Sequence, residues 1–566
     1  WQITDQGPRE GNYLEGSGSA MFVYTVAKAV NQGYLPREPY ATCARRGFQG
    51  LVAHLIKTDE QSHVSLTQIC EGAGLGYTTA KGIPRDGSYK YYLSEPIVSN
   101  DPKGTGPFIL AGIQLEKLLA PHAATENHAA SDEKADIGWG AMGDILSRIH
   151  APFFPNRDFP ITNFGARPGE SATRAIRAAI EACSAAGGGR VVIPAGEWES
   201  GAIRLKSGVN LHVDDKATLK FSTNFSDYPN VFTRWEGIEC YNYSAFIYAF
   251  EEHDIAVTGN GTLDGQASDE NWWSWKKKRD DAKALNEMGQ KGIPVEQRVF
   301  GAGHFLRPDF IETYRCKNVL IEGVSIVRSP MWELHPTLSE NVIVRDVRIH
   351  SHGPNNDGCD PESSRDVLID RCVFDTGDDC IAIKSGRNND GRRVNVPSEN
   401  IVIRGCTMLD GHGGIVIGSE VSGGCRNVFA EDCKMDSPML DRVLRFKSNA
   451  ERGGAIENVF LRRVQVGQVT EAILTVDLMY EEGAKGSFPP TIRNVSLEQV
   501  TGEHVPRVLW IDAFPAATVD NITFRDCTFR GLDAAELVAN AGRITFDHVS
   551  IEPAHRHDSL NSRKLP

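Results

Sequence analysis

The sequence predicts an all-β fold, a right-handed parallel β-helix, for most of its 566 residues, preceded by a shorter α-helical segment. Two observations support this fold class. Short phrases that alternate apolar and polar residues recur from residue 318 onward at intervals of roughly 22 to 36 residues, a period typical of solenoids. No helical pattern separates these phrases, which excludes βαβ units with their interposed helices.

Each repeated phrase begins with Asn or Asp and is expected to form one short strand. Coiling pairs each strand with the next at about 4.8 Å, turns branched side chains inward and lets longer inserts project on one side. A β-propeller, the alternative, needs about four strands per repeat, which these intervals cannot hold. The phrases are NVLIEGVSIV from residue 318, NVIVRDVRIH from 341, DVLIDRCVFD from 366, NIVIRGCTML from 400, NVFAEDCKMD from 427, NVFLRRVQVG from 458, NVSLEQVTGE from 494 and NITFRDCTFR from 521.

The residues ahead of the repeats are expected to close the open end of the solenoid. From about residue 157 the sequence predicts a strand, one amphipathic helix near 171–184 and a glycine-rich turn into another strand. Solenoids require such a cap. Four cysteines recur at one place in the repeat, and we expect them to stack as buried free thiols instead of forming a disulfide framework. They are Cys372, Cys406, Cys433 and Cys527.

The first part of the chain has a helical period. Residues 17–35 and 40–56 place apolar side chains at helical spacing, and Ser17 and Ser19 are candidate N-caps of the first helix. Both helices are amphipathic and must pack against others. The sequence is therefore expected to divide into an α-helical segment at 1–118, a linker at 119–156, the β-helix at 157–555 and a tail at 556–566.

Composition and charge exclude two classes of function. The formal net charge is -14, whereas proteins that bind nucleic acid carry a basic footprint. No uninterrupted apolar run is long enough to span a bilayer. The chain starts at Trp1 without a basic and then apolar leader, so we expect a targeting peptide to have been removed or to lie upstream.

Three aspartates stand among glycines and asparagines about one repeat apart. Asp357 precedes Asp378 by 21 residues, so adjacent coils should bring the two together on one face of the solenoid. In the phrase IAIK (381–384) the isoleucines are expected inward and Lys384 outward. A lone buried carboxylate is strongly disfavoured, so the strand should begin after Asp379, with both neighbouring acids facing solvent or a cleft.

A histidine, two cations and a tyrosine recur at similar places in the following coils. Glycines flank His412 and expose it at a turn. In VLRFK (443–447) the leucine and the phenylalanine fit the core, so Arg445 and Lys447 share the outer face. Tyr480 follows Arg445 by 35 residues, again near one coil with an insert.

This column suits hydrolysis of a glycosidic bond in an acidic sugar. One carboxylic acid would protonate the departing oxygen, a second carboxylate would activate water, and cations would hold the carboxylate of the sugar. Close carboxylates repel one another, which raises the pKa of at least one and keeps it protonated. A single aspartate in such a turn is usually a turn-former, but recurrence on successive coils favours a site.

Four motifs of the column resemble those of glycoside hydrolase family 28, the polygalacturonases. NND (355–357) resembles the family's Asn-Thr-Asp, GDD (377–379) its Gln/Gly-Asp-Asp, GHG (411–413) its Gly-His-Gly, and RFK (445–447) its Arg-Ile-Lys. The resemblance covers about 157–555. It implies a hydrolase of α-1,4-linked galacturonic acid that inverts the anomeric centre and uses neither a cofactor nor a metal.

Carried over by position, the resemblance implies a role for each residue. The candidate catalytic residues are Asp378 as the general acid, His412 in its support, and Asp357 and Asp379 as holders of the attacking water. By the same resemblance Arg445, Lys447 and Tyr480 bind galacturonate beside the scissile bond. Asn355, Lys384 and Arg387 are further candidate substrate-binding residues, which the resemblance does not supply. Inversion rests on the resemblance, because the spacing of adjacent coils does not distinguish it from retention.

The chain departs from the family pattern between Asp379 and His412. The insert RNNDGRRVNVPS (387–398) adds three arginines there and is expected to wall off one end of the cleft. This favours attack at a chain end over internal cleavage. The Asp-Asp and Gly-His-Gly motifs are intact, which favours homogalacturonan over rhamnogalacturonan.

The helical segment resembles a second family. GNYLEGSGSAMFVY (11–24) and RDGSYKYYLSEPIVSNDPKGTGPF (85–108) resemble the C-terminal part of glycoside hydrolase family 105, the unsaturated rhamnogalacturonyl hydrolases, whose fold is an (α/α)6 barrel. The catalytic aspartate of that family lies in its earlier part, so no catalytic residue is expected within 1–118. We expect either a remnant of a two-enzyme fusion or an accessory helical domain.

Three rival functions stay open. The first is a galacturonidase directed at rhamnogalacturonan. The second is a β-helix pectate lyase, which would hold Ca²⁺ on the acids and use Arg445 or Lys447 as the base. The third is a non-catalytic carbohydrate-binding solenoid, although an anionic polymer gains nothing from three acids. The expected partner is a pectic polysaccharide or oligogalacturonide, and a polymeric substrate implies an extracytoplasmic location, either periplasmic or secreted.

Overall fold

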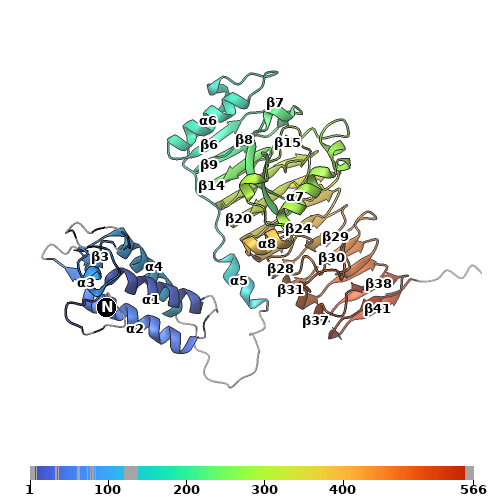
Figure 1. Cartoon of the computed structure of the whole chain (residues 1–566). Helices are drawn as coiled ribbons and strands as arrows, with labels where there is room; N and C mark the ends of the chain where they lie inside the picture. The colour runs from blue at the N-terminus through green and yellow to red at the C-terminus, as the bar shows by residue number, and fades with distance from the viewer. Residues whose placement is uncertain are drawn as a thin grey trace, which may run out of the picture. The chain divides into compact units, whose positions relative to one another are not determined.

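The computed structural model describes residues 138–554 without a gap, and before them residues 7, 9–31, 35, 37–59, 64–72, 74–76, 78, 82 and 84–119. The chain divides into two compact units, Trp1–Asp132 and Glu133–Pro566 (Figure 1). The expected tail at 556–566 lies outside the described residues.

Three helices form the body of the first unit: α1 (Gly16–Asn31), α2 (Arg37–Leu55) and α4 (Pro102–Leu119). Their apolar faces meet in one buried cluster, as the helical spacing predicts. The expected cap of α1 is wrong, because the carboxylate of Glu15 accepts hydrogen bonds from the backbone N–H groups of Ser17 and Gly18 at 2.9 and 2.6 Å. The smaller elements are β1 (Ile56–Thr58), β2 (Val64–Leu66), β3 (Ile69–Cys70), α3 (Tyr89–Tyr92) and β4 (Ile97–Val98).

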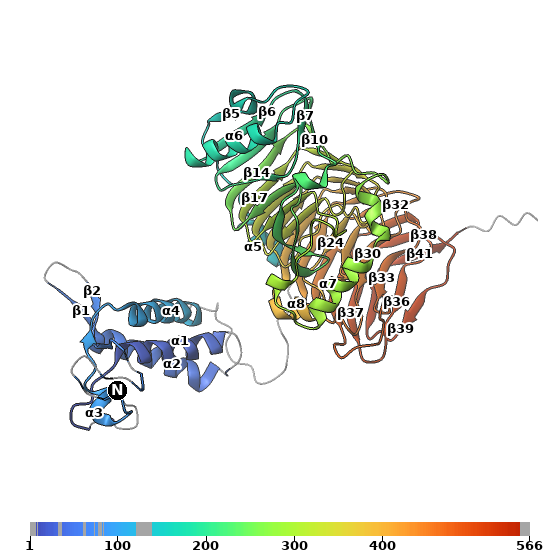
Figure 2. The same ribbon diagram turned by 45° about the horizontal axis from the view of Figure 1, so that its top comes forward.

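The second unit is a right-handed parallel β-helix, so the predicted fold class is confirmed (Figure 1, Figure 2). Each complete coil gives one strand to each of three parallel faces, called faces 1, 2 and 3 below. Face 1 consists of β5 (Asp158–Pro160), β6 (Gly189–Ile193), β9 (Val209–Val213), β14 (His253–Gly259), β17 (Lys317–Glu322), β20 (Glu340–Arg345), β22 (Arg365–Asp370), β25 (Ser398–Arg404), β28 (Cys425–Glu431), β31 (Ala455–Arg462), β34 (Thr491–Glu498), β37 (Thr518–Arg525) and β40 (Ile544–Asp547).

Face 2 follows face 1 in each coil. It consists of β7 (Gly196–Ser200), β10 (Ala217–Phe221), β15 (Thr262–Asp264), β18 (Ser325–Val327), β21 (Arg348–Ser351), β23 (Val373–Thr376), β26 (Thr407–Met408), β29 (Lys434–Met435), β32 (Gln465–Gln468), β35 (Thr501–His504), β38 (Thr528–Leu532) and β41 (Ser550–Pro553).

Face 3 has two sheets that single bridges at Cys359 connect, one to Leu334 and one to Ile381. The first sheet consists of β8 (Ile203–Arg204), β13 (Ile247–Phe250), β16 (Ile311–Tyr314) and β19 (Leu334–Thr337). The second consists of β24 (Ile381–Ile383), β27 (Ile415–Ile417), β30 (Arg442–Lys447), β33 (Ala472–Asp477), β36 (Leu509–Asp512) and β39 (Leu537–Ala539).

The asparagines that open the repeated phrases form a ladder along face 1. Asn400, Asn427, Asn458 and Asn494 all adopt left-handed backbone angles, with φ between 58° and 61°, a region that asparagine tolerates better than most residues. Each amide nitrogen donates to the previous rung, at 3.0 Å from Asn427 to Asn400 and 2.7 Å from Asn494 to Asn458. These bonds link the coils, so the repeated Asn has a structural role.

The interior is apolar and aligned in register. Val342, Val367, Ile401 and Val428 are successive Cα partners along face 1 and are all fully buried. The four recurrent cysteines are buried and free, as predicted.

Two helices cover the solenoid. Helix α6 (Thr173–Ala185) packs on the first strands and buries its apolar stripe there, which confirms the expected cap. Helix α5 (Gly140–Leu146) falls inside the range expected to be a linker. It lies on the outer side of face 1, where Met142 and Ile145 contact an apolar strip that includes Phe429 and Phe460. That strip would otherwise expose a contiguous apolar surface.

Further helices and a hairpin stand outside the coils. The hairpin pairs β11 (Asn230–Trp235) with β12 (Ile238–Tyr243). Helix α7 (Asp280–Gln290) packs on helix α8 (Asn388–Val394) and on β12, and both helices lie near β24 in the two views (Figure 1, Figure 2). The single-turn elements are η2 (Ile161–Phe164), η3 (Phe225–Asp227), η4 (Trp272–Lys277) and η5 (Val295–Gln297). Among the described residues, no helix is both long and apolar enough to cross a membrane.

Candidate active site

The three predicted aspartates lie on two successive coils, in the turns that lead from face 2 to face 3. Asp357 follows β21, and Asp378 and Asp379 follow β23. Backbone bonds hold the turns in register, with the N–H of Gly358 donating to the carbonyl of Asp379 at 3.0 Å. One carboxylate oxygen of each aspartate lies within 4.8 Å of the others. Adjacent coils thus bring the acids together, as the 21-residue spacing predicts.

Asp379 differs from the expectation. Strand β24 does begin after it, but its side chain is fully buried instead of facing solvent or a cleft. The ammonium group of Lys447 donates to Asp379 Oδ2 at 2.5 Å. A buried carboxylate is tolerated when such a counter-charge is present, and the sequence pattern alone did not reveal that pairing.

Asp357 carries the electrostatic signature of a protonated acid. Burial, and then the negative charge of Asp378, raise the pKa of Asp357 well above its ordinary value. Lys384 opposes this shift, but its Nζ is 3.5 Å from Asp357 Oδ2, and Asp357 Oδ1 has no hydrogen-bond partner within the described structure. The surroundings of Asp357 in the free protein therefore favour its protonated form.

The pKa of Asp378 is shifted in the opposite direction. Burial on its own would raise the pKa of Asp378, but a hydrogen bond from His412 and the charges of Lys447 and Lys384 outweigh it and hold the pKa below the ordinary range. His412 Nδ1 lies 3.0 Å from Asp378 Oδ1. The same contact raises the pKa of His412. The surroundings of Asp378 thus favour its ionised form, and those of His412 favour the protonated ring.

The cations occupy the outer side of β30, as the alternation predicts. Leu444 and Phe446 are fully buried in the core, and the charged groups of Arg445 and Lys447 each lie 5.8 Å from the ring centre of Tyr480. Burial favours a neutral amine, but the carboxylate of Asp379 outweighs it and raises the pKa of Lys447. Lys447 is therefore charged, which makes it a poor general base of the kind that a lyase needs.

Lys384 points outward from β24 but is covered. Its Nζ lies 3.5 Å from both Asp357 and Glu420 and 4.4 Å from the ring centre of Trp332. Neighbouring carboxylates raise the pKa of Lys384 well above its ordinary value against the effect of burial. Two ammonium groups thus supply the counter-charge for the acids, which is the part that a calcium ion would have to take.

One cavity of about 540 Å³ collects most of these groups. Seven of the ten predicted residues line it, namely Asn355, Asp357, Asp378, Lys384, Arg387, Lys447 and Tyr480. The other three contact lining residues: Asp379 contacts Lys447, His412 contacts Asp378, and Arg445 lies beside Tyr480. The described structure thus places all ten at one site.

Five cations that line the cavity were missed from the sequence, namely Lys276, Lys278, Arg279, Lys283 and Arg307, and two of them contact Asn355. Lys276 Nζ and Arg307 Nη2 donate to the side-chain oxygen of Asn355 at 2.5 and 2.7 Å. Burial lowers the pKa of Arg307 to about 10. The basic run WKKKR (275–279) was the available signal for Lys276, but it lies in an insert without a repeat register. Arg307 carried no pattern at all.

The insert that begins at Arg387 was expected to wall off one end of the cleft, and Arg387 itself lines the cavity. The backbone N–H of Arg387 donates to the carbonyl of Gly237, in the β11–β12 hairpin, at 3.0 Å. Its guanidinium lies 3.3 Å from both Glu236 and Glu481 and 3.7 Å from Glu420. Arg387 therefore ties the insert to the hairpin, and much of its charge is already engaged by the protein.

Both parts of the chain match known protein families, and the β-helix is described first. The model of glycosyl hydrolases family 28 matches residues 183–542. The structure of a hyperthermoactive exopolygalacturonase from Thermotoga maritima is 42% identical and covers 73% of this chain and 96% of that chain, with a TM-score of 0.71. A probable polygalacturonase of Vitis vinifera is 25% identical over 397 residues, which are 67% of this chain and 74% of the relative.

The first unit matches different proteins. The model of Glycosyl Hydrolase Family 88 matches residues 1–119. The structure of a family-105 glycoside hydrolase from C. acetobutylicum is 47% identical over 20% of this chain and 30% of that chain, with a TM-score of 0.19. The family model that matches residues 1–119 thus confirms that this segment resembles glycoside hydrolases of a different family from that of the solenoid.

Proposed function

The chain belongs to glycosyl hydrolases family 28, and from this premise we propose that it hydrolyses α-1,4-linked galacturonic acid in pectin, from a chain end and with inversion of the anomeric centre. The observation that carries the proposal is the meeting of three carboxylates with the ammonium groups of Lys384 and Lys447 at one cavity. Acids can cleave the glycosidic bond, and the cations suit a substrate that bears a carboxylate on every sugar.

Asp378 is the proposed general acid. It lines the cavity, whereas Asp379 lies behind Lys447. In the free protein its proton is absent, but a sugar carboxylate bound beside Lys447 would offset the positive charges that lower the pKa of Asp378. Asp357, within 4.8 Å, then passes its proton to Asp378. His412 stabilises the carboxylate that Asp378 becomes again after it protonates the leaving oxygen.

The same proton transfer prepares the second half of the reaction. Once Asp357 has given up its proton it is a carboxylate, and with Asp379 it can hold the attacking water and accept its proton. Inversion rests on family membership. The oxygen separation within 4.8 Å is shorter than the usual carboxyl separations of about 6.5–9.5 Å for inverting and about 5–5.5 Å for retaining enzymes. Proton NMR of the first anomer formed on polygalacturonate tests this step directly.

Action at a chain end is supported by the contacts between the insert at Arg387, which lines the cavity, and the β11–β12 hairpin. The hairpin and the insert at Arg387 meet there, and Glu236 and Glu481 add carboxylates. A polyanion that continued through this end would meet both a wall and like charge. The exopolygalacturonase of Thermotoga maritima that this chain resembles carries the same mode of action in its name.

The acid assignment has a sharp test. Asp378→Asn should lower turnover of polygalacturonate by about 10²–10⁴, yet leave hydrolysis of 4-nitrophenyl α-galacturonide within about tenfold of wild type, because that leaving group needs little protonation. Asp357→Asn should lose both activities. If Asp357→Asn is the variant that keeps the activated substrate, Asp357 is the acid and the proposed transfer is wrong.

Product analysis tests the substrate and the mode of attack. With polygalacturonate we expect monomer to appear while the viscosity falls slowly, and with rhamnogalacturonan we expect less product. Rapid loss of viscosity would contradict end attack. A product that absorbs ultraviolet light, formed only without a chelator, would replace the hydrolase by the calcium-dependent lyase.

Two further proposals concern the whole chain. We place the enzyme outside the cytoplasm, in the periplasm or secreted, because its proposed substrate is an extracellular polymer. We also propose that the sequence divides at 118 and 156, with the solenoid from 157 as the catalytic part and residues 1–118 as a partial helical segment. Cell fractionation tests the location, and limited proteolysis between 119 and 137 tests the division.

A further inference from the structure

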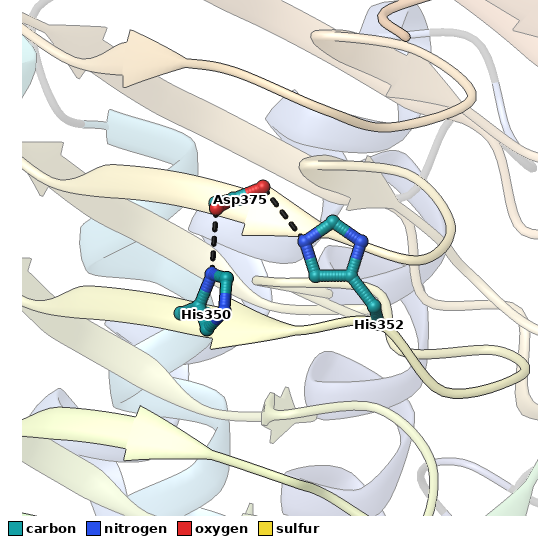
Figure 3. A group of neighbouring side chains, drawn as sticks. All are labelled: His350, His352 and Asp375. Atoms are coloured by element: carbon teal, nitrogen blue, oxygen red, sulfur yellow. Dashed lines mark hydrogen bonds and ion pairs between the residues drawn. The ribbon is translucent and has the colours of Figure 1, made fainter.

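A second group of ligating side chains lies outside the cavity, on the outer side of face 2 (Figure 3). It contains two histidines from one coil and an aspartate from the next. His350 Nδ1 lies 2.6 Å from Asp375 Oδ2, and His352 Nε2 lies 2.8 Å from Asp375 Oδ1. The two rings thus converge on one carboxylate from the same side, with their centres 5.1 Å apart.

The backbone fixes this arrangement. His350 in β21 and Asp375 in β23 are direct Cα partners in parallel strands, and His352, two residues on, projects to the same side. Cross-coil bonds hold the turn after His352, because the N–H of Gly377 donates to the carbonyl of Ser351 at 2.9 Å. The ligating groups therefore stand on rigid elements and need only side-chain rotation to change partners.

The group is open to solvent and to ions. The side chains of His350, His352 and Asp375 are 73%, 41% and 22% exposed. On the other flank of β21 the register partner of His350 is Val327, so that position brings no competing cation.

We propose that His350, His352 and Asp375 bind one divalent transition-metal ion of the zinc type, with water completing the coordination. One candidate ligand atom from each residue lies within 4.8 Å of the others. Zinc bonds of about 2.0–2.2 Å place tetrahedral ligands about 3.4 Å apart. The nitrogens of His350 and His352, which lie 2.6 and 2.8 Å from the oxygens of Asp375, would therefore move slightly apart from them to admit the ion. Two imidazoles favour zinc, nickel or copper over calcium and magnesium, which prefer oxygen ligands alone.

An ion at this position would lie close, along the chain, to the candidate catalytic acids. His352 precedes Asp357 by five residues, and Asp375 precedes Asp378 by three. An ion at this place would link the two strands whose following turns carry the candidate catalytic acids. Because it binds the folded chain and needs both coils, it would stabilise the fold by mass action.

The test is a titration of the full chain, stripped with chelator, with Zn²⁺ followed by calorimetry and with Co²⁺ followed by visible absorption. We expect one ion per chain whose affinity falls at least about tenfold in His350→Ala and in Asp375→Asn. A rise in Tm with Zn²⁺ should disappear in both variants. His253→Ala is the matched control, because His253 is an exposed histidine with a single aspartate partner, Asp254, and its removal should leave the titration unchanged.

Several results would overturn the site. Equal zinc affinity in wild type and in Asp375→Asn would do so, as would stronger binding of Ca²⁺ than of Zn²⁺. An unchanged Co²⁺ spectrum in His350→Ala would mean that the bound ion sits elsewhere. Circular dichroism of each variant, with a wild-type spectrum expected at these exposed positions, separates loss of the site from loss of the fold.

Discussion

Replacing Lys447 by methionine tests whether its buried ion pair holds the acid cluster together. Lys447 Nζ lies 2.5 Å from Asp379 Oδ2, and Asp379 Oδ1 has no hydrogen-bond partner in the described structure. Methionine keeps most of the side-chain volume but removes the ammonium group. The fully buried carboxylate of Asp379 would then have lost its direct counter-charge.

The magnitude follows from burial. Removing one partner of a buried ion pair costs about 3–5 kcal/mol in the free energy of unfolding, because the other charge stays desolvated and unpaired. Replacing both partners leaves no such charge, so Lys447→Met/Asp379→Asn should be more stable than the Lys447→Met variant by about 2 kcal/mol. This double variant should nevertheless have no measurable turnover if Asp379 helps to hold the attacking water.

Urea unfolding of wild type, both single variants and the double variant, followed by tryptophan fluorescence, completes the cycle. Lys434→Met is the control, because Lys434 is exposed on β29, and it should change the free energy of unfolding by less than about 0.5 kcal/mol. If Lys447→Met unfolds like this control, or if the second substitution destabilises the protein further, Lys447 is a substrate ligand only and the structural argument fails.

Three other substitutions test separate parts of the structure. The hydrogen bond to Asp378 raises the pKa of His412 above its ordinary value of about 6.5. The stability that this bond contributes is therefore complete below that pH and is lost as pH rises through the raised pKa. Urea unfolding between about pH 6 and pH 9 should therefore show a decline in wild type that His412→Ala lacks. Burial raises the pKa of Glu333 well above its ordinary value, so this acid is protonated when folded and its contribution falls as pH rises above about 4.5. Glu333→Gln should gain stability over wild type at neutral pH and lose that advantage near pH 4, and no pH dependence of the difference would contradict a neutral Glu333. Asn427→Ala removes two ladder bonds at a residue with φ of 60° and should cost about 2–4 kcal/mol; thermal unfolding measures this, and Asn427→Gly, which relieves the backbone strain alone, should recover part of the loss.

The sequence was most informative where residues share the register of the coils. The repeated Asn, the inward Leu444 and Phe446 and the spacing from Asp357 to Asp378 all follow from one period, so the solenoid and the meeting of the acids could be predicted. Contacts that depend on inserts could not. Arg307 reaches Asn355 from a stretch without a repeat, and no periodicity fixes its position.

Burial of charged side chains was the second feature that the sequence did not predict. Alternation places a side chain on a face but does not say what covers that face. Asp379 was expected to be accessible because a lone buried carboxylate is unfavourable, and that rule is correct for a lone group. The structure satisfies the rule differently, by bringing Lys447 from a coil 68 residues further along the chain. Predicting this required both partners to be placed at once.

The cavity carries a local charge that differs from that of the whole chain, and this determines which pectins it should accept. The protein as a whole has a formal net charge of -14 and repels a polyanion at long range. Within the cavity, lysines and arginines outnumber carboxylates even before the proton on Asp357 is counted. The lining cations are Lys276, Lys278, Arg279, Lys283, Arg307, Lys384, Arg387 and Lys447, and the lining acids are Glu236, Asp280, Asp357, Asp378, Glu420 and Glu481.

A galacturonate gains from this excess of positive charge, and its methyl ester does not. Esterification also removes the negative charge that, on our proposal, moves the proton from Asp357 to Asp378. Turnover should therefore fall more steeply than affinity as the methyl-ester content of the pectin rises. Salt separates the two electrostatic effects, because it screens the long-range repulsion while the buried pairs are screened much less. Moderate salt should thus raise the rate at which the enzyme binds its substrate without restoring turnover of the methyl ester. Equal turnover of the ester and the acid would refute the proposal that the charge of the substrate drives the proton transfer from Asp357 to Asp378.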